Sequence, residues 1–371
     1  MKKLAIVADW LPTYGGAEHV VSSLASLWPS APVFTTVACP ERLGPLAKTD
    51  LRPHPLLQRI YRLLGKHQWL LPWMPRAIES IDLQGYDIVL SSSHAVGKGI
   101  IPPASSVHVC YCHTPMRYAW EMEAEYLKDF RIRWPLTKWV KKQLKLLRRW
   151  DLTTARRVDS FIANSTETQR RIRRIYGRDS TVISPPVSAR FFDTPLHGTG
   201  SYFLALGRLV PYKRFDLLIT LANRLGLRLK IGGTGSEFER LKVMAGPTVE
   251  FLGFVPDEKL PALYAGAEAL LFPQIEDAGI VPMEAQASGV PVVGLVQGGL
   301  ADVVRDGSTG ILVPEQTIDA FTAAVSRFRA TPFDRTAIRE HARQFHEDMF
   351  RSRIGAEVAS AHDRYFLRTT A

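Results

Sequence analysis

The sequence predicts two α/β domains, each built on a doubly wound parallel sheet, because two series of short apolar segments alternate with segments of helical spacing. Between the two series, residues 183–200 are rich in Pro and Gly and lack periodicity, as expected of an interdomain connection. A length of 371 residues allows two or three domains with cores of their own. We therefore predict domains at 1–186 and 187–345, followed by a helical segment at 346–371.

Each predicted strand is a short apolar run that ends at a turn or at the start of a helix. In the first domain the expected strands are 4–8, 33–37, 88–91, 107–112 and 160–163. In the second domain they are 202–206, 229–231, 249–252, 269–272, 292–295 and 310–313, separated by helices near residues 215, 237, 260, 283 and 301. Since parallel sheets bind ligands outside the carboxyl ends of their strands, the loops that follow these runs are the candidate sites.

Composition is that of an ordinary globular chain with a basic excess. Hydrophobic residues make up 46% and charged residues 22%, and the net charge of +11 calls for an anionic partner, which could be nucleotide phosphate, lipid headgroup or nucleic acid. The three cysteines form no disulfide or zinc-site pattern, which fits a reducing cytoplasm. Asp9 ends the first apolar run too early for a signal peptide, and no run is long enough to span a bilayer, so any membrane contact should be peripheral.

Two segments of the first domain combine cations with apolar residues. The shorter one covers 56–71, and the longer one, residues 128–157, carries eleven Lys or Arg against Asp129 and Asp151. The apolar residues of the longer segment lie roughly on one helical face. Such a helix could rest on the anionic inner face of the plasma membrane. Alternatively, its apolar stripe packs on the domain, which is the commoner use of an amphipathic helix.

Residues 273–294 carry two carboxylates eight residues apart across a strand-to-helix turn. Glu276 falls on the loop after strand 269–272, Gly279 lies in the same loop, and Pro282 suits the first position of a helix that would place Glu284 in its first turn. With Gly279 and Ile280 at the helix N-terminus, this edge suits an anionic ligand. Alternatively, Glu284 is a helix-capping residue and Glu276 a solvated loop charge.

Residues 207–214 follow the first strand of the second domain and open a helix. Arg208 supplies a planar guanidinium and Lys213 a point charge beside a helix N-terminus, and this combination suits a diphosphate. Taken alone, such a pair of cations is more often solvated. Its occurrence together with the two glutamates about 70 residues later favours the binding-site interpretation.

Glycine turns and one histidine add to these candidates. Gly15 and Gly16 lie between strand 4–8 and a helix, and Gly233 lies in a similar turn after strand 229–231, so bare backbone could approach a nucleotide at both places. His113 comes directly off strand 107–112. A histidine at a strand end is usually structural, so general acid or base work is not assigned to it.

These motifs together resemble the signature of retaining GT-B glycosyltransferases of family 4 (glycosyltransferases group 1). The resemblance rests on Glu276-x7-Glu284, on a stretch similar to the family's G-R-L-x-x-x-K-G with Arg208 and Lys213, and on the string HTPMRYAW that begins at His113. It implies that Glu276 holds sugar hydroxyls of a nucleotide-sugar donor, that Glu284 holds the ribose and that His113 contacts the donor sugar. It also implies a cleft between two Rossmann-like domains, which His113 should face, and a last helix that returns to the first domain.

One position departs from the family pattern, since Arg214 stands where glycine is usual. The departure questions the turn that follows Lys213 and leaves the assignment of Arg208 and Lys213 to the diphosphate unchanged.

HTPMRYAW together with EDAGI is most similar to bacterial polysaccharide and O-antigen mannosyltransferases that use GDP-mannose. The predicted activity is retaining transfer of a hexose, mannose in the first instance, to a glycan or polyprenyl-diphosphate-linked acceptor. The chain contains no D-x-D sequence, so we expect no metal and no other cofactor. Three alternatives stay open: a UDP-sugar-dependent transferase of the same family, a GT-B sugar-nucleotide epimerase, and a nucleic-acid-binding protein, although no nucleic-acid-binding motif supports the last.

Overall fold

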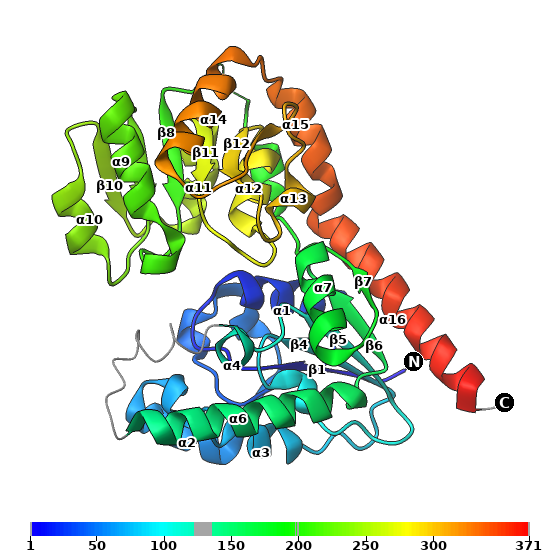
Figure 1. The fold of residues 1–371 in the computed structure, drawn as a ribbon. Coiled ribbons are helices and arrows are strands. Elements are labelled where there is room, and N and C mark those ends of the chain that lie inside the picture. The colour runs from blue at the N-terminus through cyan, green and yellow to red at the C-terminus, as the bar shows by residue number, and fades with distance from the viewer. Residues whose placement is uncertain (1, 122–135, 197, 199, 370–371) are drawn as a thin grey trace. The chain divides into compact units, whose positions relative to one another are not determined.

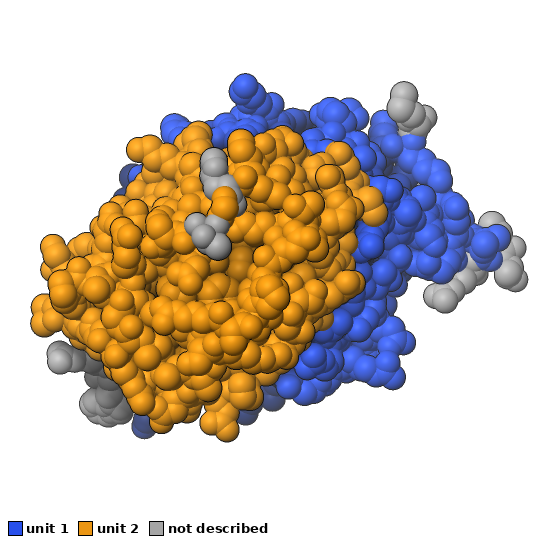
Figure 2. All heavy atoms as spheres, turned by 90° about the horizontal axis from the view of Figure 1, so that it is seen from above, with its two compact units in different colours: residues 1–184, 350–371 blue, residues 185–349 orange. Residues whose placement is uncertain are grey.

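The computed structural model describes residues 2–121, 136–196, 198 and 200–369. The chain divides into two units, coloured separately in Figure 2: unit 1 comprises residues 1–184 and 350–371, and unit 2 comprises residues 185–349. These divisions fall at 184/185 and 349/350, against predicted boundaries at 186/187 and 345/346.

Unit 1 is built on a seven-stranded sheet in which every pairing is parallel, with the order β3-β2-β1-β4-β5-β6-β7 (Figure 1). The strands are β1 (Leu4–Ala8), β2 (Val33–Thr35), β3 (Leu51–Pro53), β4 (Ile88–Ser93), β5 (Val107–Cys112), β6 (Ser160–Ala163) and β7 (Ser180–Val182). The five strands expected from the sequence are confirmed. The two strands that were not expected, β3 and β7, have three residues each and lie at the edges of the sheet. Edge strands are only partly buried, so their sequences show too little apolar pattern to predict a strand.

Helices cover both faces of this sheet. Those of unit 1 are α1 (Gly16–Leu27), α2 (Pro55–Leu64), α3 (Met74–Glu79), α4 (Arg117–Trp120), α6 (Leu136–Thr154), α7 (Thr166–Tyr176) and most of α16 (Glu347–Thr369), with short 3-10 turns at η1 (Pro40–Arg42), η2 (Gly44–Lys48), η3 (His67–Leu70), η4 (Gly97–Gly99) and η5 (Ala155–Arg157). Strand residues such as Ile6 pack with α1 and α16, whereas Ala5 and Val7 pack with α2, α3 and α6. The residues of α16 in the core share one helical face: Phe350, Ile354, Val358 and Ala361.

Unit 2 contains a six-stranded parallel sheet with the order β10-β9-β8-β11-β12-β13. Its strands, all expected from the sequence, are β8 (Tyr202–Leu206), β9 (Leu229–Gly232), β10 (Val249–Gly253), β11 (Ala267–Phe272), β12 (Val292–Leu295) and β13 (Gly310–Val313). Its helices and 3-10 turns are α8 (Ala189–Asp193), η6 (Pro211–Lys213), α9 (Phe215–Leu225), α10 (Phe238–Met244), η7 (Asp257–Lys259), α11 (Leu260–Ala265), α12 (Ile280–Ala287), α13 (Leu300–Val303), α14 (Ile318–Ala330), α15 (Arg335–Ala342) and η8 (Arg343–Phe345).

In both sheets the strand order reverses at the first strand, so that later strands are added on its other side. In unit 1 the chain crosses outward through β2 and β3 and then resumes at β4 on the other side of β1, and in unit 2 it does the same around β8 and β11. Loops leaving the two adjacent strands at such a point diverge and open a crevice at the carboxyl edge of the sheet. The structure therefore places one candidate site in each unit, after β1 and β4 and after β8 and β11.

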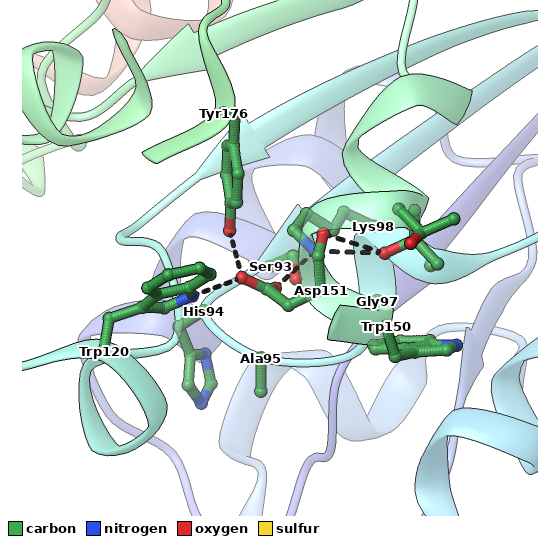
Figure 3. A network of polar contacts seen from close by, with 12 residues as sticks. Ser93, His94, Ala95, Gly97, Lys98, Trp120, Trp150, Asp151 and Tyr176 are labelled. Carbon is green, nitrogen blue, oxygen red and sulfur yellow. Dashed lines mark hydrogen bonds and ion pairs between the residues drawn. The ribbon is translucent and has the colours of Figure 1, made fainter. Parts of the chain in front are cut away.

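A buried ion pair fastens α6 to unit 1 (Figure 3). The Lys98 ammonium lies 2.5 Å from Oδ1 of Asp151, and the two side chains are 3% and 0% exposed. Trp120 Nε1 and Tyr176 Oη donate hydrogen bonds of 2.7 and 2.9 Å to Oδ2 of the same carboxylate. The Trp150 ring packs directly on the bare backbone of Gly99, where an added Cβ would lie 2.2 Å from it. These contacts hold one end of α6 firmly against the domain.

The membrane interpretation of residues 128–157 is revised by this packing. Leu144 and Leu147 are buried in the core shared with α2 and α3, and Val140 and Trp150 pack against the same core. Those apolar residues cannot also insert into a bilayer, so the alternative, packing on the domain, holds for them. Residues 128–135 and the side chains of Leu136 and Trp139, which belong to the same predicted segment, lie outside the described residues.

Replacing Asp151 by Asn should destabilise the protein by about 3–5 kcal/mol, because it leaves the Lys98 charge buried without a counter-ion. The carboxamide oxygen can still accept from Trp120 and Tyr176, so Lys98→Met combined with Asp151→Asn should recover a large part of the loss. Urea denaturation of the three proteins measures this. A single Asp151→Asn variant within 1 kcal/mol of wild type, on the order of a surface substitution, would show that the pair is dispensable.

Candidate functional site

In unit 2, the loops after β8 and β11 bring Lys213 and Glu276 together. Lys213 ends the η6 turn, and its Nζ lies 3.0 Å from Oε1 of Glu276. Gly207, the first residue after β8, lies beneath the ammonium, since a Cβ built there would be 3.1 Å from Lys213 Nζ. The side chains remain partly accessible, at 12% for Lys213 and 27% for Glu276. A cation and a carboxylate are thus presented side by side at the carboxyl edge of the sheet.

Arg208 lies in the same loop and is exposed, with its Nη2 donating a 3.4 Å hydrogen bond to the hydroxyl of Tyr212. The guanidinium is therefore presented to solvent at this edge, where an anionic ligand could reach it.

The turn after Lys213 is retained despite the departure at Arg214. Arg214 has φ 54° and ψ 39°, and it is the single non-glycine residue with positive φ in the described part of the chain. This left-handed conformation costs a non-glycine residue about 1–2 kcal/mol. Its side chain offsets the strain by donating to Asp216 at 3.2 Å and to Gln316 at 3.0 Å, and Gln316 in turn donates to the carbonyl of Pro273 at 2.8 Å. The arginine therefore ties the Lys213 loop to the loop that carries Glu276.

Gly233 belongs to a glycine loop that packs backbone to backbone on the Lys213 loop. A Cβ at Gly233 would lie 1.9 Å from the carbonyl oxygen of Gly207, and the amide of Leu209 donates to the carbonyl of Thr234 at 2.9 Å. This close approach by itself demands glycine, whether or not Gly233 also contacts a nucleotide.

In the loop between β11 and α12, the backbone of Glu276 packs against two further glycines, Gly298 and Gly299. The amide of Gly299 donates to the carbonyl of Glu276 at 2.9 Å, and a Cβ at Gly298 would lie 2.3 Å from that oxygen. The glycine pair in the loop after β12 was not singled out from the sequence, although a double glycine in a loop that follows a strand is a readable sign of close backbone approach. Also missed was Gln274, which is 1% exposed and donates to the carbonyl of Leu206 at 3.3 Å.

The helix after this loop begins earlier than expected. Gly279, with φ 70° and ψ 51°, is the cap, and α12 starts at Ile280, so Pro282 occupies the third helical position and not the first. Glu284 consequently lies at the start of the second turn. The helix begins early because the left-handed backbone of Gly279 turns the chain into the helix at Ile280, so no proline is needed at the first position.

The side chain of Glu284 is held by a tyrosine. Tyr264 donates a 2.9 Å hydrogen bond to Oε2 of Glu284. Burial raises the pKa of Glu284 to about 7, while the hydrogen bond from Tyr264 and the charge of Arg190 act in the lowering direction. The alternative of a simple capping residue does not fit, since no side chain caps α12 and Glu284 bonds to Tyr264.

In unit 1, Gly15 and Gly16 stand at the start of α1. Gly15 has extended backbone and caps the helix, Gly16 is its first residue, and both are exposed. A Cβ at Gly15 would lie 3.2 Å from Oε2 of Glu18 in the first turn. Backbone hydrogen bonds from Gly15 and Glu18 hold the Glu18 carboxylate at this helix N-terminus. The glycine pair is therefore exposed, but the amide of Gly15 already bonds to a carboxylate of the same chain.

His113 follows β5 and shares a hydrogen bond of 2.8 Å between its Nε2 and the Ser92 hydroxyl. Its ring packs edge-to-face on Tyr111, and its backbone carbonyl accepts from Thr168 at 3.1 Å. Burial, together with the charge of His94, lowers the pKa of His113 to about 3. His113 is therefore neutral at physiological pH and suits hydrogen bonding better than proton donation.

Two polar residues at the same edge were not predicted as candidates. Asp9 directly follows β1 and His94 directly follows β4, so both stand at the point where unit 1 reverses its strand order. Their position at the ends of apolar strands was readable, but the pairing of β1 with β4 was not. Among the described residues, no group of three or more His, Cys, Asp or Glu side chains is arranged to hold a metal ion.

Two parallel, doubly wound sheets with this connectivity define the GT-B class of glycosyltransferase folds. Solved structures with the same fold include HepE from Anabaena in complex with UDP and glucose, with a TM-score of 0.68, 18% identity and coverage of 97% of this chain and 100% of that one. Sucrose-phosphate synthase from Thermosynechococcus elongatus gives a TM-score of 0.71 at 18% identity, with coverage of 97% and 99%.

Family models cover both halves of the chain. The model for glycosyl transferases group 1 matches residues 188–345, and the model for glycosyltransferase family 4 matches residues 14–191. The chain belongs to this family of glycosyltransferases, which confirms the family that the motifs indicated.

Curated relatives resemble part of the chain. A GDP-mannose-dependent alpha-(1-6)-phosphatidylinositol monomannoside mannosyltransferase of Mycolicibacterium smegmatis is 36% identical over 176 residues, which are 42% of this chain and 46% of the relative. A D-inositol 3-phosphate glycosyltransferase of Mycobacteroides abscessus is 34% identical over 155 residues, 38% of this chain and 35% of the relative. The chain thus matches less than half the length of each of these relatives.

Stability should depend on pH through Glu284. Between the usual carboxyl pKa of 4.5 and the folded value of about 7, the unfolded chain releases a proton that the folded chain keeps, so rising pH favours unfolding. Glu284→Gln retains a partner for Tyr264 and cannot ionise. Urea denaturation at pH 4.5 and pH 8 should therefore show wild type losing stability relative to Glu284→Gln by at most about 3 kcal/mol. A difference between the two proteins that is constant with pH would refute the assignment.

Proposed function

We propose that the protein is a retaining hexosyltransferase that moves mannose from GDP-mannose to a glycan or polyprenyl-diphosphate-linked acceptor in bacterial polysaccharide synthesis. The observation that carries the proposal is the contact of Lys213 with Glu276, which joins the two parts of the family pattern at the switch point of the unit 2 sheet. GDP-mannose is favoured as donor by the motifs HTPMRYAW and EDAGI and by the relative named for its dependence on GDP-mannose.

In this proposal Arg208 and Lys213 neutralise the diphosphate as the bond to the sugar breaks, which is the work a metal ion does in other transferases. Glu276 accepts hydrogen bonds from the hexose, and Glu284 accepts from the ribose. Gly15, Gly16, Gly233, Gly279 and Ile280 present backbone to the donor. The acceptor hydroxyl attacks the face that the diphosphate leaves, and the leaving phosphate takes its proton, so configuration is retained without a covalent intermediate.

The test is an assay of the purified protein in EDTA-containing buffer. GDP-mannose, UDP-glucose, UDP-galactose and UDP-N-acetylglucosamine are each offered with octyl glycosides of mannose, glucose and galactose and with polyprenyl-diphosphate-linked sugars. Mannoside formation from GDP-mannose is expected. Transfer only from a UDP-sugar would favour the alternative donor, sugar isomerisation without an acceptor would favour an epimerase, and loss of activity in EDTA would refute metal independence. If no sugar nucleotide is turned over and the protein slows the gel migration of labelled nucleic acid at moderate salt, the result would favour a nucleic-acid-binding protein.

Mutants of the unit 2 site should differ in kind. Preorganised charges at a leaving group are worth roughly 3 to 4 kcal/mol each, so Lys213→Ala or Arg208→Ala should lower turnover by about a hundredfold or more. A ribose contact stabilises ground and transition state alike, so Glu284→Ala should chiefly raise the donor KM. Glu276→Ala should both lower turnover and raise the donor KM, because Glu276 orients the sugar at the reacting end.

Steady-state kinetics with the assay above makes this comparison. Arg224→Ala is a matched control, since Arg224 is an exposed cation of unit 2 paired with Asp319 on the surface. Near-normal turnover of both Lys213→Ala and Arg208→Ala at saturating donor would remove them from the leaving-group role.

We further propose that unit 1 contacts an anionic membrane through the surface of α2, η3 and the start of α3 in place of the apolar stripe of α6. In the described part of the chain, no helix is long and apolar enough to cross a bilayer. Large apolar side chains are exposed on this surface, and Leu63 is 86% and Trp69 68% accessible. The exposed apolar residues are Leu56, Leu63, Leu64, Trp69 and Trp73.

The charge of this α2–η3 surface favours an anionic bilayer over a neutral one. No Asp or Glu occurs between residues 51 and 78. The exposed cations from the start of α2 to residue 78 are Arg59, Arg62, Lys66 and Arg76. Exposed lysines of α6, which packs on the same core, add to the positive field. Aromatic and leucine side chains among cations suit the headgroup region of an anionic bilayer.

Liposome sedimentation tests the membrane contact. Binding to vesicles with 30% phosphatidylglycerol, about the content needed for a strongly anionic surface, should exceed binding to neutral vesicles and weaken with salt, at roughly 1 kcal/mol per well-placed cation. Trp69→Ser with Trp73→Ser should reduce binding, and Phe254→Ser, a 75% exposed residue of unit 2, should not. Equal binding to neutral and anionic vesicles, or unchanged binding by the tryptophan variant, would rule the surface out.

A further inference from the structure

One arginine side chain connects three loops at the carboxyl edge of the unit 2 sheet. Nη1 of Arg214 donates to Oε1 of Gln316 at 3.0 Å, and Nε2 of Gln316 donates to the carbonyl of Pro273 at 2.8 Å. Arg214 directly follows Lys213 in the loop after β8. Gln316 lies in the loop after β13, and Pro273 directly follows β11, three residues before Glu276. The Arg214–Gln316–Pro273 bridge therefore ties the Lys213 loop to the loop that carries Glu276.

The middle of this bridge requires an amide. A guanidinium only donates hydrogen bonds and a backbone carbonyl only accepts them, whereas the Gln316 amide does both. A glutamate at this position would still accept from Arg214, but it would turn an oxygen toward the carbonyl of Pro273. The side chain of Gln316 is therefore matched to both of its partners at once.

The backbone of Arg214 is strained, and its side chain does not serve the helix that it begins. Arg214 has φ 54° and ψ 39°, a conformation that glycine adopts without strain. It is the N-cap residue of α9, but its side chain makes no capping hydrogen bond there. A residue held in such a conformation points to a function that the strain serves. The contacts of the guanidinium indicate that this function is the bridge.

The ends of β8 and β11 are held together without the bridge. The two strands are paired in parallel, and Nε2 of Gln274, next to Pro273, donates to the carbonyl of Leu206 at 3.3 Å. Gln274 is 1% exposed, whereas the side chain of Arg214 is 38% exposed. A partly exposed polar contact adds little to the stability of a fold. The bridge therefore acts mainly on the position of the loop beyond the strands.

Lys213 lies between these two attachments. On one side, a Cβ at Gly207 would be 3.1 Å from Nζ of Lys213 and 3.5 Å from Nε2 of Gln274. On the other side the next residue is Arg214. A lysine ammonium stands on a flexible four-carbon stem, so its placement depends on how firmly the backbone beneath it is held. A charge that stabilises a leaving group must be in place before the bond breaks.

We propose that Arg214 is a positioning residue, which through Gln316 and the carbonyl of Pro273 fixes the backbone of Lys213 so that its ammonium meets the leaving diphosphate. This rests on the proposed function. Arg214 touches no reacting atom in this proposal, and no bond to it forms or breaks.

Arg214→Gly removes the bridge and the strain together. With the sugar nucleotide that wild type turns over, turnover should fall roughly tenfold, since a misplacement of about an ångström can cost up to a hundredfold, while the donor KM should stay within about twofold. The urea midpoint of unfolding should equal or exceed that of wild type, because glycine adopts the turn without strain. A merely structural residue would instead lose stability and turnover together.

Gln316→Glu breaks the bridge at its other half. It retains an acceptor for Arg214 but cannot donate to the carbonyl of Pro273, so it should lower turnover by a similar factor. The double variant Arg214→Gly with Gln316→Glu should be no slower than either single variant, because both remove the same bridge. Asp216→Ala is the matched control, since it removes the other bond of the same guanidinium, 3.2 Å long and within one loop. Its turnover should stay within about twofold of wild type.

The effect should disappear when Lys213 is absent. In a Lys213→Ala background, Arg214→Gly should lower turnover by less than about twofold, because no ammonium is left to position. A full tenfold loss in that background, as large as roughly that of the single variant, would overturn the inference. So would normal turnover of Arg214→Gly, or an urea midpoint that falls together with turnover in both Arg214→Gly and Gln316→Glu.

Failure of the proposed function would look different. Near-normal turnover of Lys213→Ala would overturn the leaving-group role of Lys213, and a wild-type protein that turns over no sugar nucleotide would overturn the transferase activity itself. Loss of turnover in Lys213→Ala with none in Arg214→Gly would overturn the positioning role of Arg214 alone.

Discussion

The buried contact of Lys98 with Asp151 is the constraint on which much of unit 1 depends. Taking both charges out of water is expensive, and the structure offsets the loss with donors from Trp120 and Tyr176 on the carboxylate. The pair joins α6 to the η4 turn, so α6 packs its apolar stripe inward. Trp120, the last residue of the HTPMRYAW string, is thereby a structural anchor. What remains for an external partner is the cationic side of α6 and the exposed face of α2.

The same constraint reaches the candidate site. The chain from Ser93 to Gly99 is held at one end by the Asp9 carboxylate and at the other by Asp151 through Lys98. Both anchoring side chains are buried, so the segment between them has few alternative conformations. His94 stands on this segment.

In unit 2 the switch-point loops are also held in place, but by different interactions. Its switch-point loops are held by close backbone approach at glycines and by Arg214, whose guanidinium links the Lys213 loop to the Glu276 loop through Gln316. An arginine in a left-handed turn stores strain, and strain of this kind persists where surrounding contacts over-determine it. Family membership and the juxtaposition of Lys213 with Glu276 together make this edge the proposed donor site.

The sequence by itself determined the fold class, the family and eleven of the thirteen strands found in the described residues, because strand periodicity and the Glu276-x7-Glu284 spacing are local patterns. It also indicated Lys213 and Glu276, although it could not show that they touch. Only the tertiary structure decided that the stripe of α6 is buried, that α12 begins at Ile280 and that Glu284 bonds to Tyr264. It alone paired Asp9 with His94, 85 residues apart. These contacts depend on which strands and helices become neighbours, and local sequence carries no record of that choice.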